Sequence, residues 1–337
     1  MDKNFSPVFV QQLISRAINN DSYQIVEEFF DKYSERIKWE ELLMFIIKNK
    51  VVPQFFYVIK KAKVVDKVPF SVVELLHRSV ELFDIQKERY ESEILKIHNS
   101  FSSEGIDYRL VKGLVIEKNC FDSKGLKQIT DLDIIVHSKD SKRIEEIYNE
   151  LGYSSGKFDY SSKKIVQHSR EKMLMYKLTG DHLPDYVKIE FDRPLIPLTI
   201  DTTININWEK NKTMTLNPFN SLSNVKIKNT KIKTMDDISH ICYLFLHMYK
   251  HEKSLRLQQK KLGINFAMLS DIFMFLNRCQ YWENITIIKN ECQRYGLLHE
   301  FEWGINHLKK YFFDTDCYNL ENLISSYSLI ENKWSLY

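Results

Sequence analysis

The sequence is poor in the residues that build disulfide-rich, repetitive or loosely linked proteins. Its five cysteines are odd in number and scattered without C-x-x-C spacing (Cys120, Cys242, Cys279, Cys292 and Cys317). We therefore expect reduced thiols in a cytoplasmic protein, not a disulfide framework or a zinc ribbon. Nine glycines and seven prolines in 337 residues leave little room for flexible linkers, and no internal repeat is present.

Long apolar runs and a strong net charge are also missing. No stretch approaches 18 consecutive apolar residues, so no membrane span is expected, and the first residues lack the pattern of a signal peptide. Forty-eight basic against 45 acidic residues give a net charge of only +3. A dedicated nucleic-acid binder needs a concentrated basic surface, so this balance argues against nucleic acid as a partner. What remains, 44% apolar and 28% charged residues, is typical of a globular protein with a sizeable core.

Two carboxylates inside an apolar, β-branched segment are the feature around which the chain is organised. The segment 131–136 reads DLDIIV, and alternate residues of a strand point to the same face, so Asp131 and Asp133 share one face. Two adjacent carboxylates repel unless a cation neutralises them, and paired aspartates with water and phosphate oxygens are a typical Mg²⁺ environment. The alternative is a strand end whose acids meet the solvent, because this short pattern alone is common.

The neighbouring segments favour the metal-site interpretation. A strand expected over Tyr108–Lys112 is followed by Gly113, and a glycine there lets the backbone approach a phosphate closely. The helix expected over about Leu114–Asn119 directs its N-terminal dipole to the same place. After the acidic strand, a further amphipathic helix is expected to end at Gly152. The combination of these elements indicates a metal and phosphate site more specifically than any one element alone.

This unit resembles the nucleotidyltransferase superfamily, the DNA polymerase beta-like proteins, whose signature is a glycine motif, a D-h-D pair and a third acid on a neighbouring strand. More closely than the wider superfamily, it resembles the uncharacterised bacterial nucleotidyltransferases often found near peptide natural-product genes. The matching segments are Leu110–Gly113 (LVKG), Gly125–Val136 (GLKQITDLDIIV) and Leu151–Tyr153 (LGY). Lys127 stands where that family usually has arginine. Weaker similarity extends over the helical segments on both sides.

The resemblance implies an α+β fold, with a nucleotidyltransferase-like mixed β-sheet core flanked by N- and C-terminal helical domains. The expected domains are residues 1–102 (N-terminal helical), 103–234 (nucleotidyltransferase) and 235–337 (C-terminal helical). The implied enzyme moves a nucleoside monophosphate from an NTP to an unidentified acceptor, which is a small molecule, a peptide or a protein, and releases pyrophosphate.

The resemblance also assigns roles to individual residues. Asp131 and Asp133 are expected to hold one or two Mg²⁺ ions, which neutralise the phosphate charge. Lys112, Gly113 and Lys127 are expected to bind the NTP, through the backbone at the glycine and through the charge of the two lysines. Neither the acceptor nor the oligomeric state follows from the sequence.

The third acid of the family is the position that this sequence does not match. The family motif h-[DE]-h-H-W aligns with ININW at 204–208, which puts Asn205 at the acid and Asn207 at the histidine. An amide cannot act as a base. Asp201 shares a face with Asn205 on the strand expected over Ile200–Trp208, but it lies roughly 13 Å away along that strand. On this reasoning Asp201 is too far for a simple replacement.

Glu190 is the other candidate for the third acid, provided that its strand, expected over Val187–Phe191, lies beside the D-h-D strand. Before it we expect a strand over Met173–Leu178 and a turn with the sequence GDHLP at 180–184. On a later predicted helix, His247 and His251 are four residues apart and therefore on one face. Ordinary packing is the preferred interpretation of this pair, because no third metal ligand is placed nearby.

The loss of an acid at Asn205 leaves two alternatives to the enzyme. One is a catalytically impaired protein with the same fold, which binds nucleotide or peptide without turnover. The other is an RNA nucleotidyl-adding enzyme, against which the near-neutral charge argues. We prefer the enzyme, because Lys112, Gly113 and the two aspartates of the D-h-D strand are all present.

Overall fold

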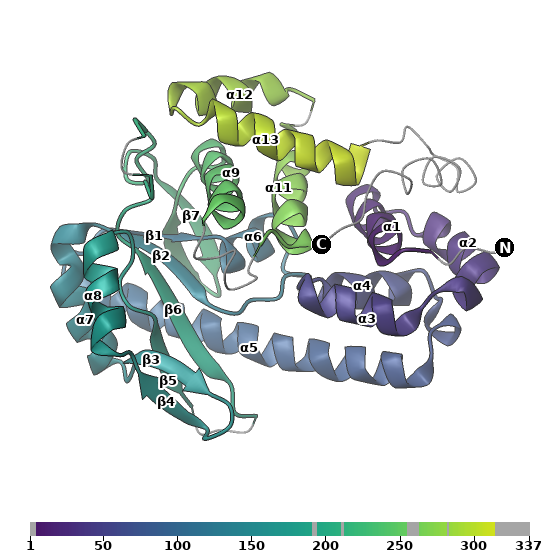
Figure 1. The fold of residues 1–337 in the computed structure, drawn as a ribbon, viewed down its shortest axis with the longest axis horizontal. Coiled ribbons are helices and arrows are strands. Elements are labelled where there is room, and N and C mark those ends of the chain that lie inside the picture. The colour runs from purple at the N-terminus through teal and green to yellow at the C-terminus, as the bar shows by residue number, and fades with distance from the viewer. Residues whose placement is uncertain (1–4, 191–193, 210–211, 255–262, 282, 314–337) are drawn as a thin grey trace.

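Helices form the N-terminal part of the molecule and lead into a mixed β-sheet (Figure 1). The computed structural model describes residues 5–190, 194–209, 212–254, 263–281 and 283–313. Phe191, Cys317 and the end of the expected third domain lie outside these ranges. The N-terminal elements are α1 (Pro7–Asn20), α2 (Gln24–Tyr33), η1 (Ser34–Arg36), α3 (Trp39–Lys48), α4 (Val52–Lys61), η2 (Val65–Lys67) and α5 (Phe70–Ser103).

The sheet has six strands in the order β1-β2-β6-β5-β3-β4. Strands β2 and β6 run parallel, and every other neighbouring pair in this sheet is antiparallel. The strands are β1 (Tyr108–Val111), β2 (Leu132–Val136), β3 (Ser154–Asp159), β4 (Lys164–Gln167), β5 (Tyr186–Ile189) and β6 (Pro197–Thr203). Helices connect them: α6 (Gly113–Asn119), η3 (Ser138–Asp140), α7 (Ser141–Glu150) and α8 (Arg170–Thr179).

A hairpin and a second group of helices follow the sheet (Figure 1). Their bounds are β7 (Ser223–Ile227), β8 (Thr230–Thr234), α9 (Asp237–Lys253), α11 (Phe266–Arg278), α12 (Ile285–Arg294), α13 (Leu298–Leu308) and η4 (Lys309–Phe313). The expected α+β fold, with a mixed sheet and helices at both ends, is therefore confirmed. Among the described residues, no helix is both long enough and apolar enough to cross a membrane.

The two faces of the sheet belong to different cores. Leu132 and Ile134 of β2 pack with Ile94 of α5 and Ile147 of α7 on one face. Ile135, on the opposite face, belongs to the core that contains α9. Because side chains alternate along a strand, Asp133 shares the face of Ile135 and points toward the helices that follow the sheet.

Helices from both ends of the chain share that second core. It joins residues of α1 to α4 with residues of α9, α11 and α13, and Figure 1 shows α11 next to α1. The division into three domains at residues 102 and 234 stays a prediction.

The expected strand at Met173–Leu178 is wrong, because this segment lies within helix α8. Local capping explains the difference. The Ser169 side chain accepts a hydrogen bond from the Lys172 N–H (3.3 Å) and so caps the start of the helix. Gly180, with a φ of 64°, ends the helix in the left-handed conformation that glycine favours. The apolar residues that suggested a strand are largely exposed on this helix.

Candidate active site

The register of the parallel strands brings a third acid to the acidic pair. Asp133 of β2 lies opposite Val111 of β1 on one side and opposite Asp201 of β6 on the other. Neighbouring strands are about 4.8 Å apart, and residues in register point to the same face, so these two carboxylates are neighbours. Asp131 lies one residue before β2, and its carboxylate accepts a hydrogen bond from the Thr130 hydroxyl (3.1 Å).

Asn205, the residue aligned with the acid of the family motif, does not join this group. Strand β6 ends at Thr203, two residues before it, and Asn205 is exposed. Its backbone N–H donates to the Asp181 carbonyl oxygen (3.1 Å), and its side chain accepts from the Asn207 N–H (2.9 Å). The sequence argument judged Asp201 by its distance from Asn205, whereas the relevant neighbour is Asp133.

Glu190 also lies away from the aspartates. It follows β5, and β6 separates β5 from β2, so the condition attached to this residue is not met. In the β5–β6 register Ile189 lies opposite Pro197, about 13 Å along the strand from Asp201. The Glu190 carboxylate lies 3.8 Å from Arg89 Nε, in an ion pair with α5.

Tyr90 of α5 holds the beginnings of both acidic strands. Its hydroxyl donates to the Thr130 carbonyl oxygen (2.6 Å) and accepts from the Thr199 N–H (3.0 Å). Thr130 precedes Asp131, and Thr199 lies two residues before Asp201, so one buried side chain ties together the two segments that carry the acids. The sequence shows Tyr90 only as part of an apolar helix face and gives no sign of this role.

We expect Tyr90→Phe to lower the free energy of unfolding by about 1–3 kcal/mol, because a buried carbonyl and a buried N–H lose their partner. Urea denaturation measures this effect. Tyr160→Phe, at an exposed position, is the control. An unchanged stability of Tyr90→Phe would contradict the assigned hydrogen bonds.

Lys112 connects the acids to α9 and has a strained backbone. Its φ of 55° and ψ of −133° are unusual for a residue with a side chain, and such conformations cost about 1–3 kcal/mol. Its ammonium group forms an ion pair with the Asp133 carboxylate. Its backbone N–H donates to His240 Nε2 (3.1 Å). Lys112 was expected to contact phosphate, and here it is the counterion of the central aspartate.

Gly113 is the first residue of α6, and the strained conformation belongs to its neighbour Lys112. A Cβ atom added at Gly113 would lie 3.7 Å from the Asp131 carbonyl oxygen and 3.6 Å from Ile129 Cγ2, which are ordinary contacts. Internal packing therefore does not require glycine here. Gly113 is only partly buried, and its backbone lies beside that of Asp131.

Lys127 forms an ion pair with Asp271, which is not one of the three aspartates Asp131, Asp133 and Asp201. Its ammonium nitrogen lies 2.6 Å from a carboxylate oxygen of Asp271 on α11, and both side chains are largely buried. The Glu117 carboxylate accepts hydrogen bonds from the N–H groups of Gly125 (2.5 Å) and Lys127 (2.8 Å). These contacts anchor the loop that leads to Asp131, so the structure shows Lys127 as an anchor of that loop.

Helix α9 presents a row of buried or half-buried polar side chains to Lys112. His240, Tyr243 and His247 are three or four residues apart, hence on one face. Burial, together with the nearby charge of Lys112, lowers the pKa of His240 to about 3. The same causes lower the pKa of His247 well below its usual value, and its Nε2 lies 3.4 Å from Lys112 Nζ. Both histidines are neutral at neutral pH, and His251 packs against His247 with ring centroids 4.7 Å apart.

The turn after α8 adds a further acid and a histidine. Asp181 Oδ2 lies 3.1 Å from His182 Nδ1 and 3.1 Å from the ammonium nitrogen of Lys250 on α9. The Leu183 N–H donates to the Thr202 carbonyl oxygen (2.9 Å) and holds this turn against β6. The sequence GDHLP marks a turn but not its neighbours, so Asp181, His182 and Lys250 could not be placed from the sequence.

Four aspartates and two lysines form the charged group at this position. The carboxylates are Asp131, Asp133, Asp181 and Asp201, and the ammonium groups are Lys112 and Lys250, so the group has two more carboxylates than ammonium groups. Burial and the charges of Asp131 and Asp201 raise the pKa of Asp133, although the Lys112 ammonium opposes this shift. A divalent cation would remove the repulsion, because it favours the ionised form of each carboxylate.

The donor chemistry at this position suits Mg²⁺ bound together with a nucleotide. In the described part of the chain, no three His, Cys, Asp or Glu side chains lie close enough to hold a metal ion by themselves. Mg²⁺ is usually held by only one or two carboxylates, with phosphate oxygens and water completing its shell. Asp131 and Asp133 fit that pattern, and the backbone of Gly113 lies beside that of Asp131.

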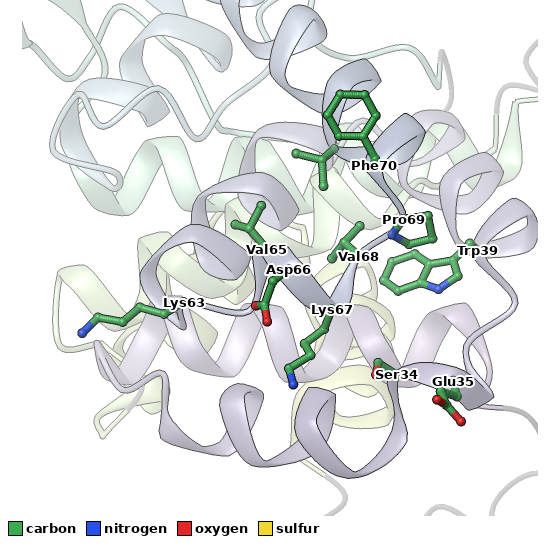
Figure 2. Close-up of a pocket in the computed structure, with 11 residues that line it drawn as sticks. Ser34, Glu35, Trp39, Lys63, Val65, Asp66, Lys67, Val68, Pro69 and Phe70 are labelled. Carbon is green, nitrogen blue, oxygen red and sulfur yellow. The ribbon is translucent and has the colours of Figure 1, made fainter.

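A separate hollow of about 940 Å³ opens among the N-terminal helices, lined by Trp39, Val65, Pro69 and Phe70 (Figure 2). Phe70 begins α5, whereas Tyr90, which contacts the acidic strands, lies about 30 Å further along the helix axis. The hollow is therefore remote from the carboxylates.

Comparison with known proteins identifies a family that covers most of the chain. The family described as uncharacterised nucleotidyltransferase matches residues 35–313. A nucleotidyltransferase-like antigenic protein from Paracoccidioides brasiliensis is 12% identical, with 60% of this chain and 90% of that chain covered and a TM-score of 0.30. The antibiotic-resistance factor ANT(2'')-Ia is 9% identical, with 62% and 99% covered and a TM-score of 0.27. No curated protein matches the sequence.

Proposed function

Because the chain belongs to the uncharacterised nucleotidyltransferase family, we propose that it is a Mg²⁺-dependent enzyme that moves a nucleoside monophosphate from an NTP to an acceptor hydroxyl. Pyrophosphate is the other product, and the acceptor is a small molecule, a peptide or a protein. One observation carries the proposal: Asp133 and Asp201 lie opposite each other on the adjacent parallel strands β2 and β6, and Asp131 directly precedes β2, beside the backbone of Gly113.

In this proposal the protein contributes positioning and charge more than covalent chemistry. Asp131 and Asp133 hold Mg²⁺, which when bound neutralises the charge of the phosphates and of the leaving pyrophosphate. The backbone at Gly113 borders the phosphates, and Lys112 supplies positive charge from within the same group. Asp201 accepts the proton of the attacking hydroxyl, which is the role that the sequence left open between Glu190 and Asp201.

The binder without turnover was suggested by the amide at Asn205. Asp201 weakens this argument for the binder. It places a third carboxylate beside Asp133, so the amide at Asn205 does not leave the site without one. The binder therefore becomes an outcome of the test below.

The test supplies each NTP, labelled at the α-phosphate, with Mg²⁺ and a cell lysate. We expect pyrophosphate to be released and label to appear in an acceptor, and we expect EDTA to stop both, because the aspartates cannot neutralise the phosphates without a cation. Mass spectrometry of the labelled product then identifies the acceptor. Tight binding of Mg·NTP with neither pyrophosphate nor labelled product would support the binder and contradict the enzyme.

A further inference from the structure

Strand β4 lies at one edge of the six-stranded sheet (Figure 1). It pairs with β3 and, among the strands that the structure describes, with no other. The side chains of Lys164, Val166 and Gln167 are exposed, so this edge is open to solvent. An open edge presents unpaired N–H and C=O groups to which another extended chain can bond. The proposed transfer reaction gives this edge no role.

The register identifies which backbone groups of β4 face outward. The Gly156 N–H of β3 donates to the Asp185 carbonyl oxygen (3.0 Å), on the side of β5. Because successive residues of a strand bond to opposite sides, Lys157 bonds toward β4, where it lies opposite Val166. The N–H and C=O of Ile165, one residue before Val166, therefore point away from the sheet.

The segment around this edge carries a concentrated positive charge. Residues 157–179 contain six basic and two acidic residues, a net charge of +4, whereas the whole chain carries only +3. Lys157 and Lys164 are exposed and lie on the same face of the β3–β4 hairpin. The acid opposite Lys164, Asp159, accepts hydrogen bonds from two N–H groups of the following turn (3.1 Å each). A chain that pairs with β4 is therefore favoured when it carries acidic side chains on this face.

Other occupants suit this edge less well. If two copies paired through β4, the lysines of one copy would face those of the other, and like charges on neighbouring strands are destabilising. A lipid surface needs a continuous apolar face, whereas the exposed Val166 has Lys157 and Lys164 as its neighbours. Nucleic acid would use the charge but not the outward N–H and C=O of Ile165. An acidic polypeptide uses both the charge and the backbone edge.

The end of β4 lies level with the candidate active site. Gln167 lies opposite Gly156, and the Gly156 N–H donates to the Asp185 carbonyl oxygen. The β5–β6 register, continued by one residue, places Asp185 opposite Asp201. A strand added outside β4 would be four strand spacings, about 19 Å, from β6. An extended chain covers this distance with about six residues.

We propose that the outer edge of β4 together with Lys157 and Lys164 (the docking edge) binds the acceptor, and that this acceptor is an acidic polypeptide which adds a strand to the sheet. The hydroxyl that receives the nucleotide lies about six residues or more from the docked segment, because a closer one cannot reach the aspartates. The inference rests on the proposed function and names the class of its acceptor, and the transfer step itself is unchanged.

A binding assay without nucleotide tests the charge of the docking edge. The probe is a fluorescein-labelled peptide in which glutamate alternates with valine and threonine, and anisotropy reports its binding. We expect the double variant Lys157→Glu and Lys164→Glu to bind it about 10-fold more weakly and to gain affinity for the same peptide with lysine in place of glutamate. The control Lys226→Glu and Lys231→Glu changes two exposed lysines that lie opposite each other in the β7–β8 hairpin, and it should bind as the parent does.

Two results of this assay would overturn the proposal. One is equal affinity of the parent for the glutamate and lysine peptides, or parental affinity in the variant with both Lys157 and Lys164 replaced. The other is tighter binding of phosphatidylserine vesicles, or of a single-stranded oligonucleotide, than of the acidic peptide. Either ligand would then show that the charge serves a membrane or a nucleic acid.

Backbone pairing is tested separately from charge. Ile165→Pro removes an outward N–H but no bond to β3, and proline is tolerated at the edge of a sheet. We expect peptide binding about 10-fold weaker, whereas Ile165→Val, which keeps the N–H, should bind as the parent does. In the parent, which needs no substitution, the bound peptide should slow hydrogen exchange of the Ile165 amide. Unchanged exchange at this amide with peptide bound would exclude strand addition.

Labelled Mg·NTP then separates the docking edge from the proposed function. Probe peptides carry a serine at each end, either roughly two or roughly eight residues from the glutamate–valine segment, and label should enter only the longer peptide. Equal labelling of both would contradict the docking geometry. Peptide binding with these signatures, but no label or pyrophosphate with any acceptor, would support the docking edge and contradict the transfer reaction. Equal labelling of a lysate acceptor by the parent and by the variant with Lys157→Glu and Lys164→Glu would support the transfer reaction and overturn the docking edge.

Discussion

Asp201→Asn is expected to lower the rate of pyrophosphate release by about 10²–10⁴-fold, the usual contribution of a general base, with little change in the affinity for Mg·NTP. The reason is the parallel register, which places this carboxylate beside Asp133 on the face toward α9. The amide has the same size and retains hydrogen-bonding ability, so the substitution removes the base without leaving a void. Steady-state kinetics and a separate titration of nucleotide measure the two quantities.

Two variants serve as controls for the position of the base. Asn205→Asp adds a carboxylate at the position suggested by the family motif, but Asn205 is exposed beyond the end of β6, so the rate should stay near that of the parent. Glu190→Gln should also have little effect, because its carboxylate is paired with Arg89 at the far end of β5. A parental rate for Asp201→Asn, combined with a gain for Asn205→Asp, would contradict the observed register.

The double variant Asp131→Asn and Asp133→Asn is expected to lose Mg²⁺-dependent NTP binding by more than about 100-fold and to lose turnover with it. Amide oxygens carry no charge and ligate Mg²⁺ weakly, so neither position can replace its carboxylate. Calorimetric titration of NTP with and without Mg²⁺ measures the loss. Binding of Mg·NTP as tight as in the parent would contradict the metal role of both residues.

The same variant should change stability only modestly, because two effects oppose each other. Loss of the carboxylates relieves their repulsion, but it also leaves the Lys112 ammonium without its nearest partner. Breaking one side of a buried ion pair costs about 3–5 kcal/mol, and the relieved repulsion offsets part of this. Adding Lys112→Met should restore stability but not nucleotide binding, because both charges of the pair are then gone. Urea denaturation of the double and triple variants compares them.

Local patterns determined much of this protein. The alternation in residues 131–136 predicts a strand with acids on one face, and the structure has β2 there with Leu132 and Ile134 in the opposite core. The proline-led start near Phe70 and the apolar face behind it predict the long helix α5. Such features follow from the sequence because the repeat of a strand or a helix is contained within a few consecutive residues.

Only the tertiary structure decided which distant residues meet the two aspartates. Asp201 lies beside Asp133 through the register of two parallel strands, and no short segment specifies that register, since it depends on packing against both faces of the sheet. The neighbours of His182 and Lys127 were also decided by the tertiary structure. A turn that pairs with the end of β6 brings His182 near Asp201. Lys127 pairs with Asp271, which comes from α11. The sequence supplied these side chains, but their neighbours come from elements far apart in the chain, and only side-chain packing in three dimensions selects them.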